Sequence, residues 1–186
     1  MKELILASQS PRRRELLAKC TDRFTVEAAD IVETLDPQKP LSEEIQKLAR
    51  AKAAAVSAKH PNAMVLGSDT IVVLDGEVLG KPRDTEDAVR MLKELSGRTH
   101  QVLTGVCLLG PGFCKTDVSV SHVTFAPMSE DEIRAYAESG DPLDKAGAYG
   151  IQGMAARYIT GIEGDYYAIM GLPVHLVYEL LKQAGC

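Results

Sequence analysis

The chain has 186 residues, of which 45% are hydrophobic and 25% charged, and its formal net charge is −5. This length is enough to bury a core without disulfides, as one domain or as two small lobes. The negative charge argues against nucleic acid as a partner, so any basic site must be local. No apolar run reaches the ~18 residues that span a bilayer, and the first run is too short for a signal peptide. We therefore expect a cytoplasmic protein without a membrane partner.

The N-terminal segment predicts a strand, a serine turn and a helix. Residues 4–7 are apolar, Ser10 is a favoured N-cap residue, and Pro11 suits the first helical position. Arg12, Arg13 and Arg14 follow in the first turn, where the helix dipole disfavours cations. A bound anion would remove this conflict, because free amides and guanidinium groups match a phosphate. The alternative is an arginine cluster that simply points into water.

A long amphipathic helix is predicted after a short strand at residues 24–31 and a polar loop at residues 33–40. Ser42 is the expected N-cap residue of this helix. Apolar residues at helical spacing predict one buried stripe, formed by Ile45, Leu48, Ala49, Ala53 and Val56. Lys52 shares the stripe, so its side chain either snorkels to the surface or points into a cleft.

Two apolar runs joined by Asp75-Gly76 predict a tight hairpin, which follows a buried strand at residues 63–67. The register of the hairpin pairs Thr70 with Lys81. Asp69 then points to the opposite face, so a bulge or a strand end is needed if Asp69 and Thr70 serve one site. An acid at the end of a strand suits a ligand crevice, and a capping or turn aspartate is the alternative.

The remaining segments continue the alternation of helices and strands and favour an α/β domain. Asp84 is the expected N-cap of a helix that ends at Gly97, and residues 102–109 and 115–125 predict a long hairpin. The last segments are a capping-box helix from Ser129, a glycine-rich loop at residues 141–153, strands broken by glycines at residues 157–170, and a helix opened by Pro173 with Leu176, Val177, Leu180 and Leu181 buried.

The cysteines and histidines indicate neither a zinc site nor a disulfide framework. The four cysteines show no C-x-x-C spacing, so reduced thiols are expected, although Cys107 and Cys114 could face each other across a hairpin. No pair of histidines has the spacing of zinc ligands.

Several familiar sequence motifs are absent. Only three residues separate Gly76 from Gly80, and Pro82 follows Lys81, so the Walker pattern fails. No G-x-G-x-x-G follows the first strand, and no G-x-S-x-G elbow is present. What remains is a set of arginines, lysines and carboxylates without an obvious covalent nucleophile. That set suits phosphate chemistry with magnesium or manganese.

A series of short motifs resembles the Maf family of nucleoside triphosphate pyrophosphatases. The motifs run in order along the chain: SQSPRRRELL at 8–17, GSDT at 67–70, LGKP at 79–82, LSGRTH at 95–100, DKAGAYGIQG at 144–153, EGDYY at 163–167 and GLP at 171–173. Each motif is weak by itself, but together they are specific.

The resemblance implies a mixed, twisted sheet with flanking helices, in two lobes around a central cleft, as a single Maf-like domain over residues 1–186. It also implies a hydrolase that converts a nucleoside triphosphate to the monophosphate and pyrophosphate with a divalent cation, Mg²⁺ or Mn²⁺, and that is commonly a homodimer. At the matching positions, Asp69 is similar to the proton acceptor that activates water. The implied phosphate-binding residues are Ser8, Ser10, Arg13, Lys52 and Lys81, and the implied metal ligands are Glu33 and Asp69.

Arg12, Thr70 and Gln152 resemble the specificity residues of the branch that acts on dTTP and UTP. A glutamine amide offers a donor and an acceptor together, which complements a uracil or thymine edge. Two alternatives remain open from the sequence. One is a nucleotide-binding regulator of cell division and septum formation whose catalysis is incidental. The other is a house-cleaning enzyme that acts on modified pyrimidine triphosphates.

Overall fold

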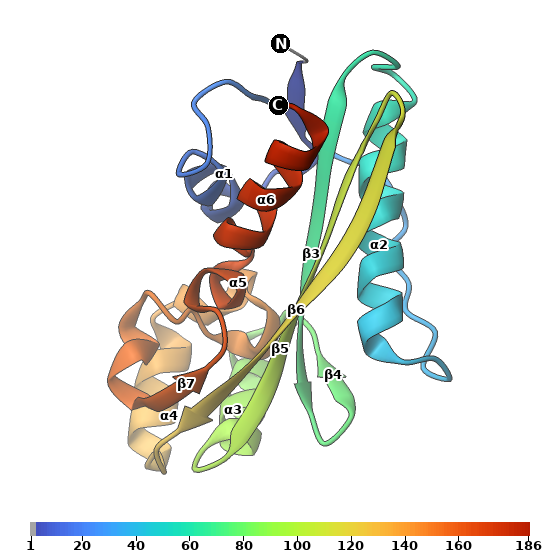
Figure 1. The fold of residues 1–186 in the computed structure, drawn as a ribbon. Helices are drawn as coiled ribbons and strands as arrows, with labels where there is room; N and C mark the ends of the chain where they lie inside the picture. The colour runs from blue at the N-terminus through green and yellow to red at the C-terminus, as the bar shows by residue number, and fades with distance from the viewer. Residues whose placement is uncertain (1–2) are drawn as a thin grey trace. The chain divides into compact units, whose positions relative to one another are not determined.

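The computed structural model describes residues 3–186, which form an α/β protein around a seven-stranded mixed sheet (Figure 1). The strand order is β2-β1-β3-β5-β6-β7, and β4 pairs with β3 off this path. The strands are β1 (Leu4–Leu6), β2 (Thr25–Val26), β3 (Met64–Leu74), β4 (Glu77–Leu79), β5 (Thr99–Gly110), β6 (Phe113–Phe125) and β7 (Ile159–Glu163). The α-helices are α1 (Pro11–Leu17), α2 (Leu41–Ser57), α3 (Thr85–Leu95), α4 (Glu130–Glu138), α5 (Tyr166–Met170) and α6 (Val174–Ala184). The expected mixed α/β fold is confirmed.

The chain divides into two compact units. The first comprises residues 3–70, 104–119 and 171–186, and the second comprises residues 71–103 and 120–170. Strands β3, β5 and β6 contribute residues to both units. The single domain expected over residues 1–186 stays a prediction. Within residues 3–186, none of the helices has the length and hydropathy of a membrane span.

The first unit is built on parallel pairing of β1 with β2 and with β3. Helices α1 and α6 lie side by side in this unit (Figure 1). Helix α2 buries the stripe predicted from its sequence, and Ala49, Ala53 and Val56 pack with Ile5 and Val65 of the strands. Its close approach to the strands requires glycine, because a Cβ on Gly105 would lie 2.5 Å from the carbonyl oxygen of Ile45.

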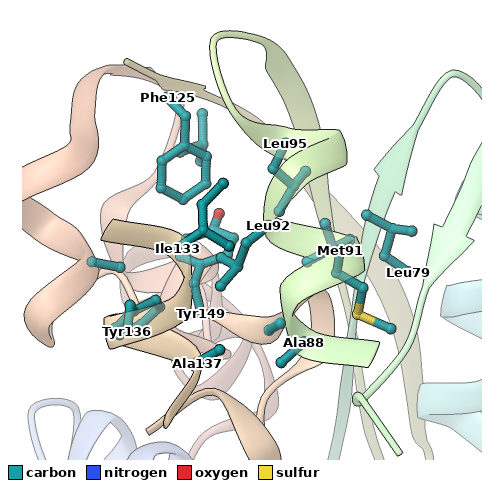
Figure 2. Packing of buried hydrophobic residues seen from close by; sticks show 14 of the residues in the cluster. Leu79, Ala88, Met91, Leu92, Leu95, Phe125, Ile133, Tyr136, Ala137 and Tyr149 are labelled. Atoms are coloured by element: carbon teal, nitrogen blue, oxygen red, sulfur yellow. The ribbon is translucent and has the colours of Figure 1, made fainter. Parts of the chain in front are cut away.

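The second unit has its own hydrophobic core between α3 and α4 (Figure 2). Leu92 and Leu95 of α3 lie on the side of Ile133 of α4, and Met91 lies on the side of Leu79 of β4 in this cluster. The helix boundaries follow local capping. Asp84 accepts a hydrogen bond from the Asp87 amide, and Ser129 forms the predicted capping box. Gly97, just beyond α3, has a φ of +69°, as expected for a residue that ends a helix.

Three boundary predictions were wrong, each for a local reason. Strand β2 covers only Thr25–Val26, because its partner β1 is three residues long and pairing ends with it. Helix α2 begins after Pro40 rather than Ser42, since the Pro40 carbonyl accepts the first helical hydrogen bonds from Glu43 and Glu44. Residues 166–170 form the helix α5 instead of a strand, because Oδ1 of Asp165 accepts hydrogen bonds from two amides of its first turn.

Strand β3 runs without interruption from Met64 to Leu74. Two smaller points concern side chains. Leu176 of α6 is half-buried rather than buried. No disulfide joins the four cysteines, all of which lie within the part of the chain that the structure describes.

Candidate active site

Lys52 and Asp69 meet where α2 lies directly on β3. A Cβ on Gly67 would be 2.1 Å from the carbonyl oxygen of Ala49, so glycine is required for this approach. Side chains alternate along a strand, which places Asp69 on the same face as Gly67, toward α2. The Nζ atom of Lys52 lies 3.0 Å from Oδ2 of Asp69 and 2.7 Å from Oε1 of Glu33. The side chain of Lys52 is only 10% exposed, so it does not snorkel to the surface.

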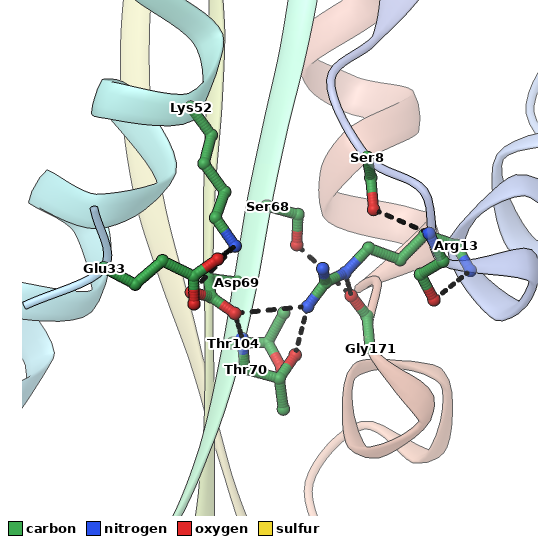
Figure 3. A network of polar contacts seen from close by, with 10 residues as sticks. Ser8, Arg13, Glu33, Lys52, Ser68, Asp69, Thr70, Thr104 and Gly171 are labelled. Atoms are coloured by element: carbon green, nitrogen blue, oxygen red, sulfur yellow. Dashed lines mark hydrogen bonds and ion pairs between the residues drawn. The ribbon is translucent and has the colours of Figure 1, made fainter. Parts of the chain in front are cut away.

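Arg13 approaches the same aspartate from the first turn of α1 (Figure 3). Its Nε donates to the carbonyl oxygen of Gly171 at 2.9 Å, and its Nη2 donates to Oγ1 of Thr70 at 3.2 Å. Nη2 also lies 3.6 Å from Oδ1 of Asp69. With 12% of its side chain exposed, Arg13 does not point into water, which contradicts the alternative interpretation of the arginine cluster for this residue.

No break in β3 is needed to bring Asp69 and Thr70 together. Their side chains follow the alternation of the strand, and Nη2 of Arg13 reaches an oxygen of each. The Thr70 amide also donates to Oδ1 of Asp69 at 2.8 Å. Both side chains therefore contact one guanidinium from a continuous strand. No bulge or strand end is required, because Nη2 of Arg13 lies close enough to contact both.

The two oxygens of Asp69 differ in their surroundings. Oδ1 accepts the hydrogen bond from Thr70 and faces Arg13. Oδ2 is buried and accepts no aligned hydrogen bond from any described residue, although the ammonium of Lys52 lies beside it in an ion pair. Oδ2 therefore keeps capacity to accept a proton or to bind a cation.

Burial is the main influence on the Arg13 guanidinium and lowers its pKa, and repulsion from Arg12 acts in the same direction. Asp69 and Glu33 raise that pKa and so oppose the effect of burial. An arginine remains protonated in proteins, so Arg13 is a buried cation. Its Nη1 group has no partner among residues 3–186, which leaves two N–H donors for an anion.

Ser8 and Ser10 line the turn before α1. Oγ of Ser10 accepts from the Arg13 amide at 3.4 Å, as the predicted N-cap requires, and Oγ of Ser8 accepts from the Ser10 amide at 3.1 Å. Both hydroxyls act as acceptors in these contacts, so their O–H donors are available to a phosphate oxygen.

Glu33 and Asp69 offer two carboxylates to a metal ion. Both contact the same Nζ atom of Lys52, so their oxygens converge. No group of three or more histidine, cysteine, aspartate or glutamate side chains suitable for a metal occurs among residues 3–186. Magnesium is commonly held by one or two carboxylates together with substrate phosphates and water. The two carboxylates, which converge on the ammonium of Lys52, therefore offer oxygen ligands of the kind that such an ion takes.

Lys81 and Gln152 belong to the second unit, and both are exposed. The β3–β4 ladder ends at the pair Val72↔Leu79, so the predicted pairing of Thr70 with Lys81 does not form part of it. The loop that carries Gln152 is held internally, since the Gly150 amide donates to the hydroxyl of Tyr136 at 3.3 Å. The roles of Lys81 and Gln152 stay predictions.

Ser68, Thr104 and Gly171 are contact residues for which the sequence predicted no role. Ser68 donates to the Gly171 carbonyl at 3.2 Å, and the hydroxyls of Thr104 and Thr70 lie 2.9 Å apart. Ser68 and Gly171 lie within family motifs. The signal at Thr104 was a single polar side chain inside an apolar strand.

The fold and this cluster define an α/β protein that gathers buried cations and an acid around a helix start, as phosphate chemistry requires. The profile of the family described as Maf-like protein matches residues 3–184, so the chain belongs to the Maf family.

Relatives of nearly the same length share about half of the sequence. The chain is 52% identical to a dTTP/UTP pyrophosphatase of Koribacter versatilis, over 98% of this chain and 94% of the relative. It is 48% identical to a dTTP/UTP pyrophosphatase of Bacillus velezensis, over 98% and 96%. Among solved structures, it resembles the Staphylococcus aureus Ham1 protein with a TM-score of 0.53 and 18% identity, over 98% of this chain and 100% of that chain. This last likeness concerns the fold alone.

Proposed function

We propose that this chain hydrolyses dTTP and UTP to the nucleoside monophosphate and pyrophosphate. The observation that carries the proposal is the buried carboxylate of Asp69 between the cations Lys52 and Arg13. The names of relatives about 50% identical over nearly the whole chain support the substrate assignment.

Asp69 acts as the general base in this proposal. Its Oδ2 accepts a proton from a water molecule whose oxygen attacks the α-phosphorus. The bond between that phosphorus and the oxygen bridging to the β-phosphate then breaks, and pyrophosphate leaves. The absence of an aligned hydrogen bond on Oδ2 supports this role, because among the described residues only the ion pair with Lys52 engages this atom.

The positive side chains hold the phosphates and stabilise the negative charge of the leaving pyrophosphate. Arg13 does so through its Nη1 donors, while its Nε and Nη2 anchor it to the protein. Lys52 and Lys81 add positive charge, and the hydroxyls of Ser8 and Ser10 donate to phosphate oxygens.

Glu33 and Asp69 would hold the divalent metal, Mg²⁺ or Mn²⁺. When bound, such an ion neutralises phosphate charge and polarises the reacting phosphoryl group. Arg12, Thr70 and Gln152 set the preference for a pyrimidine base, with the amide of Gln152 matching the donor and acceptor pattern of a uracil or thymine edge.

Pyrophosphate release tests the proposal. All common ribo- and deoxyribonucleoside triphosphates, together with modified pyrimidine triphosphates, would be assayed with Mg²⁺, with Mn²⁺ and with a chelator. We expect the highest kcat/KM for uracil and thymine nucleotides and little turnover after chelation. Equal turnover of purine and pyrimidine nucleotides would contradict the specificity assignment, and release of orthophosphate instead of pyrophosphate would contradict the reaction.

We also propose that the chain is a cytoplasmic protein and, on the family resemblance alone, a homodimer. Sedimentation equilibrium of the full chain, with and without dTTP, would separate a dimer from a monomer.

A further inference from the structure

The guanidinium of Arg13 is held at two corners by protein groups (Figure 3). At one corner, the carbonyl oxygen of Gly171 accepts from Nε at 2.9 Å and from the Ser68 hydroxyl at 3.2 Å. At the other corner, Oγ1 of Thr70 accepts from Nη2 at 3.2 Å and lies 2.9 Å from Oγ1 of Thr104. Each of these two groups is thus fixed by a second residue behind it.

Thr104 is the second residue at the Thr70 corner. Its side chain is fully buried in β5, with 0% of the residue exposed, so it cannot touch a substrate. A buried hydroxyl is costly unless it forms hydrogen bonds. In the apolar strand around Thr104, a valine would fill the same space without that cost. The hydroxyl is therefore placed for what it contacts, and one of its contacts is Thr70.

The contact fixes the direction in which Thr70 presents its lone pairs. A threonine hydroxyl has one donor and two acceptor positions. With one lone pair directed at Nη2 of Arg13, the bond to Thr104 uses either the hydrogen or the other lone pair of Thr70. In both arrangements the oxygen is held between two partners, so Thr70 cannot rotate away from Arg13 without losing both bonds.

We propose that Thr104 is a positioning residue for phosphate binding, which acts through the Thr70 hydroxyl to hold Arg13 with its Nη1 donors open to an anion. This inference rests on the proposed function for the identity of that anion, the polyphosphate of the substrate. Because Thr104 acts on a phosphate-binding cation, its loss weakens binding of inorganic pyrophosphate as well as of triphosphates. Thr70 also belongs to the proposed specificity residues, so the test uses pyrophosphate, which carries no nucleobase.

The test compares Thr104→Val, which removes the hydroxyl at nearly constant shape, with Thr104→Ser, which keeps it. Calorimetry with inorganic pyrophosphate reports on the phosphate site without requiring turnover. The loss of one neutral hydrogen bond predicts about three- to tenfold weaker binding for Thr104→Val, and binding close to wild type for Thr104→Ser. Thr104→Ala serves as the second hydroxyl-free variant if the valine variant melts early.

Thr99→Val is the matched control, because Thr99 lies on the same strand and its hydroxyl pairs with that of Thr124 at 2.7 Å. Thr99 and Thr124 belong to the second unit and have no place in the cluster around Arg13. We expect pyrophosphate binding by Thr99→Val to equal that of the wild type. An equal loss in Thr99→Val and Thr104→Val would overturn the inference.

A double-mutant cycle distinguishes positioning from general packing. If Thr104 acts through Arg13, Thr104→Val has no further effect on pyrophosphate binding once Arg13→Lys is present. Additive losses would show that Thr104 acts elsewhere. A wild type that binds pyrophosphate with this coupling but hydrolyses no nucleotide would disprove the proposed function and leave the role of Thr104 standing. A wild type that neither binds pyrophosphate nor hydrolyses a nucleotide would overturn both.

Discussion

Asp69 in the first unit and Asp87 in the second are both nearly buried, at 9% and 6% exposure, and each has two basic neighbours. Their carboxylates are nevertheless bonded differently. Both oxygens of Asp87 accept hydrogen bonds, Oδ2 from the amide and Nε of Arg83 and Oδ1 from Nε of Arg90. Oδ2 of Asp69 accepts no aligned hydrogen bond within residues 3–186.

The cations around the two aspartates differ as well. The side chains of Arg83 and Arg90 are 83% and 50% exposed, so their pairing with Asp87 removes little charge from water. Arg13 and Lys52 are only 12% and 10% exposed. Burying a cation has a desolvation cost that pairing alone seldom recovers. The Asp87 network therefore resembles a helix N-terminus that is stabilised by charge. In the Asp69 cluster, burial of Arg13 and Lys52 has a desolvation cost, which a bound polyphosphate would offset.

The largest expected effect is the loss of the carboxylate at Asp69. Asp69→Asn keeps the shape of the side chain but removes the proton acceptor, and general-base catalysis contributes about 10²- to 10⁴-fold to rates. We expect kcat for dTTP hydrolysis to fall by that order. Asp87→Asn removes the acceptor of hydrogen bonds from Arg83 and Arg90, so it lowers the melting temperature and leaves kcat per folded molecule within about twofold.

Steady-state kinetics and thermal melts of both variants measure this contrast. Comparable kcat values for Asp69→Asn and the wild type would exclude Asp69 as the base. A large loss of kcat in Asp87→Asn without unfolding would remove the distinction between the two carboxylates.

An intermediate effect is expected from replacing arginine by lysine in each cluster. A lysine at position 13 cannot bond Gly171 and Thr70 from two corners of a planar group while still offering donors to an anion. Hydrogen bonds to charged groups contribute about 1.5–3 kcal/mol, so kcat/KM for Arg13→Lys should fall by about one to two orders of magnitude. Arg90→Lys is the matched control, because Arg90 is half exposed and its partner Asp87 keeps its bonds to Arg83. A Michaelis series in which both variants match the wild type would contradict the assigned role of Arg13.

Local signals in the sequence were enough to predict much of this fold. The helical spacing from Ile45 to Val56 predicted the buried face of α2, and Ser10, Asp84 and Ser129 were identified as N-caps because capping depends only on neighbours in the chain. The extent of β2 was not predictable from its own residues, since the length of β1 limits it.

The partners of the site residues depend on contacts between distant segments. That Lys52 lies on the apolar stripe was visible in the sequence. Its contact with Asp69 and Glu33 depends on the approach of α2 to β3 at Gly67, which only the packed structure reveals. The contact between the hydroxyls of Thr104 and Thr70 likewise depends on the packing of β5 beside β3, and the sequence alone did not predict it.

The smallest expected effect concerns pH and the stability contributed by Asp87. The backbone amide of Arg83, followed by the side chains of Arg83 and Arg90, lowers the pKa of Asp87 from 3.8 to about 2. Because the folded pKa lies below the unfolded one, the stability that Asp87 contributes is complete above about pH 4 and declines as the pH falls toward 2. The difference in unfolding free energy between the wild type and Asp87→Asn should therefore be constant from pH 7 to about 5 and shrink below pH 4.

Urea unfolding of both proteins between pH 7 and pH 3 measures this difference. The subtraction also cancels the contribution of a second acid-sensitive group to the unfolding free energy. Burial lowers the pKa of His100 to about 4. The unfolded chain binds a proton at His100 before the folded one does, so stability falls in both proteins between about pH 6.5 and 4. This loss is common to wild type and Asp87→Asn and cancels in the subtraction. A difference that stays constant down to pH 3 would mean that Asp87 keeps an ordinary pKa, and its two arginines would then be surface neighbours that do not stabilise its charge.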